Sequence, residues 1–295
     1  PHDWTVRLQK NSLANTFAGA YPNTSYHRFM EERHSNIETI YNIGWYRKQF
    51  SLDPEWEGKR VFIEFEGIFR DAIVWVNGVY LDRHNSGYTS FAIEITDHLV
   101  FGADNSIAVR VDSEQAEGWW YEGAGIYRNV HLLIGEPTYF KYHQTVVKAD
   151  LNGRVEASAI LVNDTADIAE KTVAWCIEDA NGREVAHAES TVLIAPYSEK
   201  ATDVEMQVDT PNLWSVDHPY LYTLKLQAGC EQTSERFGIR TVAFDPERGF
   251  LLNGEPLKVR GACVHQDFGG VGVALTDNLQ YYKIKRLKDM GVNAY

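Results

Sequence analysis

The sequence predicts a mainly β protein, in which two successive β-sandwiches precede the opening of a parallel α/β domain. Three observations support this. Short segments of alternating apolar and polar residues recur along most of the chain. Asn-Gly dipeptides, which favour tight hairpin turns, stand at 77–78, 152–153, 181–182 and 253–254. A convincing helical period occurs once, near the end. We expect domains at 1–136, 137–243 and 244–295.

The first block has the alternation of half-buried strands. Val61, Ile63 and Phe65 alternate with more polar neighbours. Two apolar runs flank Asn77-Gly78, which is the pattern of a two-residue hairpin. Further strands are expected around 91–95, 107–111 and 130–134. Short strands with turns between them predict a β-sandwich or a jelly roll.

The second block follows Glu136-Pro137 and is again a series of strands. They are expected at 146–149, 154–162, 172–178, 184–188, 201–208, 220–227 and 233–239. About seven strands in roughly 100 residues is the size of an immunoglobulin-like sandwich. The Cys…Trp…Cys pattern of antibody domains is absent, so the prediction concerns the architecture alone.

The third block changes character. A strand is expected at 257–264 and a further strand at 292–295, with a helix between them. Thr276 is the expected N-cap and Gly291 the helix stop. The predicted apolar stripe of the helix is Leu279, Tyr282, Ile284, Leu287 and Met290. A strand, a helix and a strand form one βαβ unit, which cannot bury both faces of its sheet alone. We therefore expect the chain to end inside a domain.

Composition and charge exclude several classes of protein. The chain has 295 residues, of which 44% are hydrophobic and 23% charged, and this is ordinary globular composition. It carries 28 basic and 41 acidic residues, so its formal net charge is −13. This charge argues against nucleic acid as a partner, because phosphate binding needs a basic surface. No apolar run is long enough for a membrane span, so no membrane partner is expected.

The cysteines and histidines indicate neither a metal site nor a cofactor. Cys176, Cys230 and Cys263 are far apart and form no CxxC pair, although a Cys176–Cys230 disulfide remains open. The chain opens on Pro1 rather than Met, so the compartment is unknown. It would be periplasmic or secreted if a signal peptide came before this stretch, and cytoplasmic otherwise.

Eight motifs in the same order resemble those of family 2 glycoside hydrolases, which include β-galactosidases, β-glucuronidases and β-mannosidases. They cover nearly the whole chain. They are GWYRKQF at 44–50, FEG at 65–67 with VWVNG at 74–78, GYTSF at 87–91, GAGIYRNV at 123–130, PNLWS at 211–215 with PYLY at 219–222, FGIR at 237–240, FLLNG at 250–254 and RGACVHQD at 260–267. The last run is similar to the variant found in β-galactosidase-like members.

The resemblance implies a jelly-roll sugar-binding domain, an immunoglobulin-like domain and the start of a truncated (β/α)8 barrel. It further implies a retaining, exo-acting β-glycosidase that removes terminal β-linked sugars, with β-galactosidase the first choice. Such enzymes use two carboxylates about 5–5.5 Å apart. In the family both glutamates lie on later barrel strands, so they are expected beyond Tyr295. This chain alone should hold no catalytic residue and be inactive, and whether the parent is a homo-oligomer is open.

The resemblance also implies candidate substrate contacts. His265 and Asp267 follow the first barrel strand, at the end where such barrels bind their substrates. Gln266 stands where relatives often have His or Glu. Trp120 offers an aromatic face for a sugar ring, with packing of the sandwich as the alternative. Asn42 and Glu122 are weaker candidates, and Glu122 is equally well a solvated loop carboxylate.

Other residues are expected to be structural. Arg70 and Asp71 fit an ion pair or a backbone clamp. Gly123 and Gly125 serve tight loop backbone. Cys263 is expected to be a small buried side chain, because no base is paired with it. Two alternatives to the enzyme remain at this point: a non-catalytic carbohydrate-binding β-sandwich protein, and a purely structural module.

Overall fold

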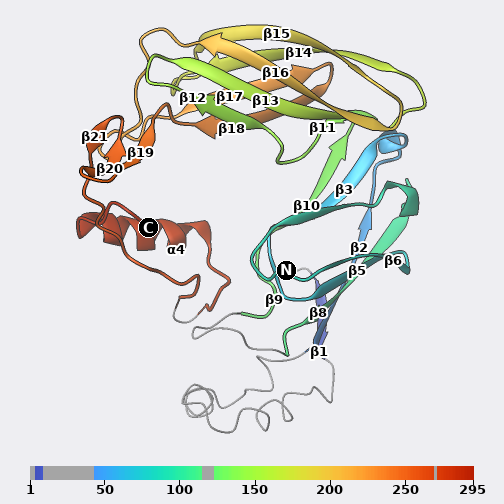
Figure 1. Ribbon diagram of the computed structural model, residues 1–295. Helices are drawn as coiled ribbons and strands as arrows, with labels where there is room; N and C mark the ends of the chain where they lie inside the picture. The colour runs from blue at the N-terminus through green and yellow to red at the C-terminus, as the bar shows by residue number, and fades with distance from the viewer. Residues whose placement is uncertain (1–3, 9–42, 115–122, 269–270) are drawn as a thin grey trace, which may run out of the picture. The chain divides into compact units, whose positions relative to one another are not determined.

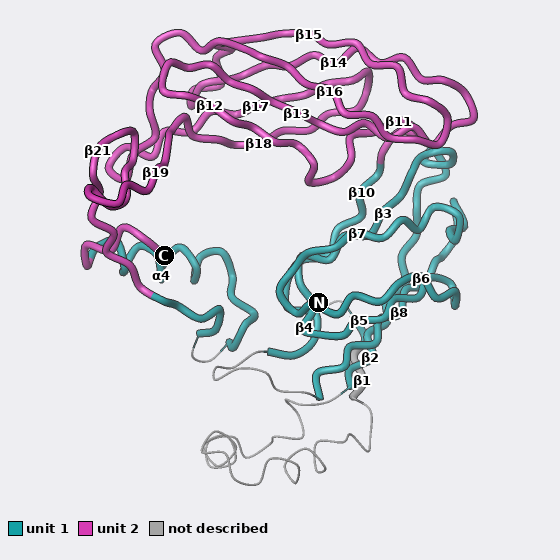
Figure 2. Tube along the Cα trace, viewed as in Figure 1, with its two compact units in different colours: residues 1–134, 263–289 teal, residues 135–262, 290–295 magenta. Residues whose placement is uncertain are grey.

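The computed structural model describes residues 4–8, 43–114, 123–268 and 271–295 (Figure 1). The chain divides into two compact units, shown in teal and magenta in Figure 2. The first unit contains residues up to 134 together with 263–289. The second contains residues 135–262 together with 290–295. Strands dominate both units, which confirms the predicted mainly β class.

The first unit contains a sandwich of antiparallel sheets. One sheet has the order β1 (Thr5–Leu8), β2 (Ile43–Ser51), β8 (Asp104–Asp112), β5 (Ala72–Val76) and β6 (Val79–His84). A second has the order β10 (Val130–Gly135), β3 (Arg60–Phe65) and β7 (Phe91–Glu94), and β4 (Ile68–Phe69) pairs with β9 (Gly125–Ile126). Two 3-10 turns, η1 (Pro54–Trp56) and η2 (Thr96–His98), lie between strands.

The alternation in the sequence corresponds to the buried faces of this sandwich. Val61 and Phe65 are fully buried and Ile63 is 4% exposed, and their side chains belong to one apolar core. The hairpin between β5 and β6 also forms as predicted. Asn77 and Gly78 have φ angles of 49° and 82°, which matches a turn with positive φ at both central positions.

The second unit contains the immunoglobulin-like sandwich. In one sheet β13 (Arg154–Asn163) pairs with β11 (Thr138–Phe140), β12 (Val146–Ala149) and β16 (Ser198–Gln207). The other has the order β15 (Glu184–Ile194), β14 (Ala169–Glu178), β17 (Tyr222–Ala228) and β18 (Glu231–Phe237). All seven predicted strands are present. The fully buried rings of Trp175 and Tyr222 belong to the core of this sandwich.

In two turns of this sandwich, an aspartate carboxylate accepts hydrogen bonds from backbone nitrogens of the turn. The Oδ1 atom of Asp150 accepts hydrogen bonds from the backbone nitrogens of Asn152 and Arg154. The Oδ1 atom of Asp179 accepts in the same way from Asn181 and Arg183. The backbone hydrogen bond from Arg183, foremost among these contacts, lowers the pKa of the Asp179 carboxyl. An aspartate side chain therefore holds the loop before each Gly in place.

The predicted strand at 257–264 is wrong. The chain first forms a small sheet from β19 (Val242–Asp245), β20 (Gly249–Leu252) and β21 (Glu255–Pro256). Beyond it, Gly261 forms an isolated parallel bridge with Ala294. A parallel pair is stable inside a larger covered sheet, and the described residues supply just these two segments. The (β/α)8 barrel thus stays a prediction.

The predicted helix is present as α4 (Asp277–Asp289). The hydroxyl of Thr276 accepts a hydrogen bond from the backbone nitrogen of Leu279 at 3.4 Å, and Gly291 has a φ angle of 87°. The start and the end of the helix therefore lie where the sequence predicted them, at Thr276 and Gly291. Among the described residues, no helix has the length and apolar character that a membrane crossing requires.

Much of the predicted apolar stripe of α4 is exposed. Tyr282, Ile284 and Met290 are exposed, at 49%, 48% and 78%. Leu279 and Leu287 of the stripe are half-buried, together with Gln280 and Lys283. These four follow helical spacing on one face. The apolar side chains are spread around much of the helix circumference. Within the described residues, only the side that carries Leu279 and Leu287 is partly covered.

The three cysteines are free thiols. Cys176 lies opposite Lys225 in the β14–β17 pair, and Cys230 comes five residues after Lys225 along the chain. At about 3.4 Å per residue this register separates the two cysteines far beyond disulfide reach. Cys263 is exposed, so its predicted burial is wrong. It lies in an open loop rather than in a strand.

We predict that Asn163→Ala destabilises the protein by about 2 kcal/mol, because it leaves several buried groups unpaired. Asn163 is fully buried, and its amide nitrogen donates to the carbonyls of Asp167, Ile194 and Ala195. Urea unfolding measures the loss. The control is Thr172→Ala, which removes an exposed hydroxyl contact and should stay within about 0.5 kcal/mol of wild type. Equal effects of the two substitutions would contradict the role of Asn163.

We predict that Cys176 resists alkylation by iodoacetamide at pH 8 and reacts only as the pH approaches 11. Burial, the hydrogen bond to Glu184 and the charges of Glu184 and Glu178 raise the pKa of its thiol to about 11. The thiolate is the nucleophile, so the rate should rise with pH through that range. Mass spectrometry of the labelled peptides follows each cysteine. Labelling of Cys176 at pH 8 as fast as the exposed Cys230 would refute the prediction.

Candidate functional site

The loop that follows Gly261 carries the two central site candidates. The side chain of His265 is exposed, and that of Asp267 is half-buried. An imidazole and a carboxylate can each hydrogen-bond the hydroxyls of a sugar. The structure therefore brings both residues into one loop of the first unit.

Lys283 fixes the backbone of this loop. Its Nζ atom donates hydrogen bonds to the carbonyl oxygens of His265 and Asp267, both at 3.1 Å. One ammonium thus ties two loop positions to the half-buried face of α4. Lys283 was not predicted from the sequence. The available signal was its spacing of four residues from Leu279, which places the two on the same helix face.

Gln266 lies between the two tethered carbonyls. Its Nε2 atom is buried and makes no hydrogen bond within the described residues. A buried amide nitrogen without an acceptor is costly, by about 1–3 kcal/mol. Gln266 is thus more buried than His265 next to it.

The second half of the loop turns back and docks on the sandwich. Phe268 and Gly272 pair through backbone hydrogen bonds of 2.9 and 3.0 Å. Val273 and Leu275 then become buried, at 7% and 5% exposed. A Cβ atom placed on Gly123 would lie 2.4 Å from the Cγ2 atom of Val273. Val273 therefore packs directly on the backbone of Gly123, and only glycine leaves room for it.

The segment after Gly123 is held against the sandwich in the same manner. Gly125 has a φ angle of 86°, and a Cβ atom there would lie 1.9 Å from the hydroxyl of Tyr46. That hydroxyl accepts a hydrogen bond from the backbone nitrogen of Ile126 at 3.3 Å. Burial raises the pKa of Tyr46, although the bond from Ile126 opposes the shift. These contacts support the expectation that Gly123 and Gly125 shape loop backbone.

Tyr127 extends the same close packing. Its hydroxyl donates to the carbonyl oxygen of Gly87 at 2.9 Å, and its ring lies against Gly67, where a Cβ atom would come within 2.7 Å. Burial is the main cause that raises its pKa. For Arg70 and Asp71 the sequence left an ion pair or a backbone clamp as alternatives, and Asp71 forms its ion pair with Arg83 instead of Arg70. Asp71 accepts from Arg83, with the closest atoms 2.7 Å apart, because β6 brings Arg83 beside it.

The remaining candidates, Asn42, Trp120 and Glu122, lie outside the described residues. Within the part that is described, no group of three His, Cys, Asp or Glu side chains could hold a metal ion.

Two family profiles match the chain. One, described as "Glycosyl hydrolases family 2, sugar binding domain", covers residues 9–136. The other, described as "Glycosyl hydrolases family 2", covers residues 138–240. The chain belongs to glycosyl hydrolase family 2. The first profile coincides with the sandwich that Val273 contacts, and the second with the immunoglobulin-like sandwich.

Individual family 2 proteins agree with this assignment. A beta-galactosidase of Bacteroides ovatus is 34% identical over 305 residues, which cover 99% of this chain and 34% of that protein. A beta-glucuronidase of Bacteroides fragilis is 31% identical over 315 residues, which cover 99% of this chain and 45% of that protein. The chain thus spans about a third to a half of the length of these curated relatives.

A solved family 2 structure supports the fold. The crystal structure of a family 2 member from Bacteroides cellulosilyticus superposes with a TM-score of 0.82 at 35% identity. The superposition covers 85% of this chain and 36% of that one.

We predict that Gly123→Ala destabilises the first unit by about 3 kcal/mol, because it adds an overlap with Val273 to the strain of a positive φ angle. Gly78→Ala is the matched control, since Gly78 also has positive φ but has no atom within 4 Å of the position that a methyl group would take. It should cost about 1 kcal/mol. Thermal unfolding of both variants measures the difference, and equal costs would show that Val273 does not pack on Gly123.

Proposed function

We propose that the full-length protein is a retaining, exo-acting β-glycosidase that hydrolyses terminal β-linked sugars. The observation that supports this is the match of 99% of the chain to a family 2 protein named as a beta-galactosidase. Such enzymes use two carboxylates about 5–5.5 Å apart, one as the acid and one as the nucleophile. In this proposal both carboxylates would come from chain beyond Tyr295. The 295 residues would supply support and substrate contacts.

In this proposal His265 and Asp267 contact the sugar that occupies the pocket of the barrel. The exposed imidazole can donate to or accept from a hydroxyl, and a carboxylate can accept from two adjacent hydroxyls. The tether from Lys283 keeps the carbonyls on either side of Gln266 fixed. A preformed loop loses less conformational entropy on binding, so it binds more tightly.

β-Galactosidase is the first choice for the substrate, and β-glucuronidase is the alternative. The RGACVHQD run at 260–267 supports the former. The named relatives include both activities. Galactose and glucuronic acid differ by a hydroxyl orientation and a carboxylate, and the groups that distinguish them are expected on later barrel loops.

The direct test is hydrolysis of a panel of nitrophenyl β-glycosides by the full-length protein. We expect the galactoside to be cleaved fastest, with retention of the anomeric configuration in the first product as seen by proton NMR. If the glucuronide is cleaved fastest, the proposed substrate changes from a β-galactoside to a β-glucuronide. Failure to cleave any β-glycoside would refute the enzyme and favour a carbohydrate-binding protein.

We predict that Lys283→Met in the full-length enzyme raises KM about tenfold and changes kcat less. Loss of the tether frees the His265–Asp267 loop, which must then be ordered on binding. Lys283→Arg keeps a cationic donor and should recover part of the affinity. The matched control is Lys285→Met, because Lys285 is exposed on the same helix and pairs with Asp289. Equal KM values for the Lys283 and Lys285 variants would contradict this role.

A further inference from the structure

Four Asn-Gly dipeptides occupy turns between strands, at 77–78, 152–153, 181–182 and 253–254. An asparagine is open to loss of its side-chain amide when the backbone nitrogen of the next residue can attack the carboxamide carbon. Glycine shields that nitrogen least, because it has no Cβ atom. Asparagine is accordingly one of the thermolabile residues of proteins. Since the four turns share the same dipeptide, any difference in their reactivity comes from the fold.

The carboxamides of Asn77 and Asn253 are held at both ends. The amide nitrogen of Asn77 donates to the carbonyl oxygen of His98, and its oxygen accepts from the backbone nitrogen of Ser106, each at 2.8 Å. Asn253 is held in the same way, by a carbonyl oxygen and a backbone nitrogen that each lie 3.0 Å away. Neither carboxamide can turn toward the following glycine unless two hydrogen bonds break.

The side chains of Asn152 and Asn181 are exposed, and among the described residues no hydrogen bond holds either carboxamide. The backbone nitrogen of the following glycine donates to a carbonyl oxygen of the turn, at 3.1 Å for Gly153 and 3.0 Å for Gly182. Attack on the carboxamide therefore requires that this backbone hydrogen bond opens. Exposed turns open at a small cost in free energy.

The backbone around Gly153 is further restrained, whereas that around Gly182 is open. The carbonyl oxygen of Gly153 accepts from the backbone nitrogen of Val208 at 2.9 Å, and a Cβ atom on Gly153 would lie 2.1 Å from the Val208 oxygen. The carbonyl oxygen of Asn152 also accepts, from the side chain of Gln207 at 2.8 Å. Gly182 is exposed, and no atom lies within 4 Å of the position that its Cβ atom would take. The attacking nitrogen is therefore least restrained in the turn between β14 and β15 (Figure 1).

We propose that Asn181 is a modification site, at which the folded protein slowly converts an amide into an aspartate or an isoaspartate. The backbone nitrogen of Gly182 gives its proton to water or hydroxide and attacks the Cγ atom of Asn181. The new C–N bond closes a succinimide ring, and the bond from Cγ to Nδ2 breaks and releases ammonia. Water then adds to either ring carbonyl and opens the ring. The net reaction takes up one water and releases one ammonia, with no oxidation or reduction.

The product alters a turn that an aspartate holds together. The Oδ1 atom of Asp179 accepts hydrogen bonds from the backbone nitrogens of Asn181 and Arg183, at 2.9 and 3.0 Å. A carboxylate at position 181 places a second negative charge close to Asp179, and like charges repel. An isoaspartate also adds one methylene to the backbone between the two donors. The modification therefore opposes the contacts that hold the hairpin of β14 and β15.

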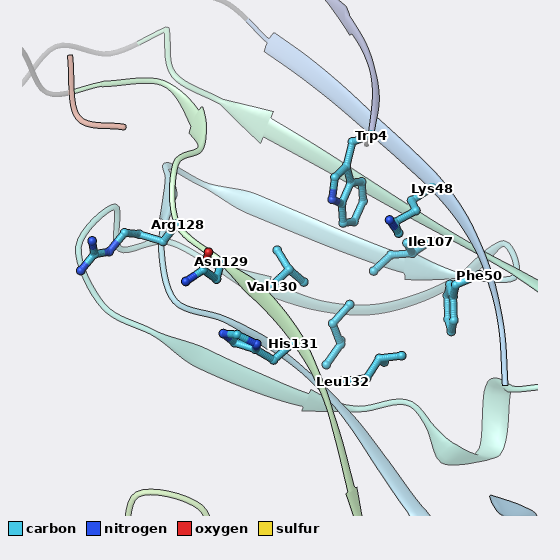
Figure 3. Close-up of a pocket in the computed structure, with 10 residues that line it drawn as sticks. Trp4, Lys48, Phe50, Ile107, Arg128, Asn129, Val130, His131 and Leu132 are labelled. Carbon is cyan, nitrogen blue, oxygen red and sulfur yellow. The ribbon is translucent and has the colours of Figure 1, made fainter. Parts of the chain in front are cut away.

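Asn129 provides an internal comparison, because it is exposed but is not followed by glycine. It lines a pocket of the first sandwich next to Val130 (Figure 3). Among the described residues no hydrogen bond holds its carboxamide. Val130 is branched at Cβ, so its side chain crowds the backbone nitrogen that would attack. Exposure without a following glycine is thus represented in the same molecule.

The test follows loss of amide groups from the full-length protein at mildly alkaline pH, by mass spectrometry of tryptic peptides. We expect Asn181 to react at least about tenfold faster than Asn77 and Asn253, because their turns must open further. Asn152 should lie between these rates, and Asn129 should react slowest. In urea, where the turns are lost, the four Asn-Gly rates should converge. The five sites fall on separate peptides, 71–83, 129–141, 149–154, 172–183 and 249–258.

Gly182→Ala tests whether the Gly182 nitrogen is the attacking group. The added methyl group enters open space but crowds this nitrogen, so modification of Asn181 should slow about tenfold. Gly229→Ala is the matched control and should leave the rate unchanged. Gly229 also has a positive φ angle and open space around it, but it follows Ala228 rather than an asparagine.

Any of three outcomes would overturn the proposal. Asn181 could react no faster than Asn77 and Asn253, Asn152 or Asn129 could react as fast as Asn181, or the Gly182 and Gly229 variants could react alike. The assay requires no hydrolysis of a glycoside, so failure of the nitrophenyl glycoside test would leave this result unaffected.

Discussion

The first unit depends on a backbone that approaches its neighbours too closely for any side chain at Gly123 and Gly125. Val273 occupies the space beside Gly123, and the hydroxyl of Tyr46 occupies that beside Gly125. A methyl group at either position would overlap its neighbour, and both glycines also have positive φ angles. The absence of a Cβ atom at Gly123 therefore allows a late segment of the chain to dock on the sandwich, and its absence at Gly125 lets the same loop pack on Tyr46.

This docking connects the candidate site to the sandwich. The loop with His265 and Asp267 is held at two places. Lys283 binds its backbone carbonyls from α4, and Val273 anchors its far end on Gly123. Both contacts act on backbone or on an apolar side chain, so neither involves the imidazole of His265. The family's sugar-binding sandwich and residues 263–289, which are part of the segment expected to begin the barrel, form one compact unit.

Local chemistry made much of the fold predictable. The alternation at Val61, Ile63 and Phe65 has one physical cause, the two faces of a strand, and the structure buries these residues as expected. Asn77-Gly78 and Thr276 act through their immediate neighbours, so the hairpin and the helix start agreed with the sequence. The immunoglobulin-like strands were predictable for the same reason.

Features that depend on distant partners were not predictable. The buried face of α4 is set by what lies beside it, and the apolar arc around Tyr282 did not specify this. Asp71 pairs with Arg83 rather than with its neighbour in sequence, because strand pairing brings β6 close. The two hydrogen bonds of Lys283 span sixteen and eighteen residues, and no local pattern marks them. The predicted strand at 257–264 needs partners that the described residues do not supply.

The central claim is that Val273 docks the His265–Asp267 loop on the sandwich. Hydrogen–deuterium exchange of the full-length protein tests it most directly, by comparing wild type with Val273→Asp. We expect faster exchange in peptides from 265–276, where Phe268 and Gly272 share backbone hydrogen bonds, and unchanged exchange in 154–163 of the immunoglobulin-like sandwich. Unchanged exchange in 265–276 would contradict the claim.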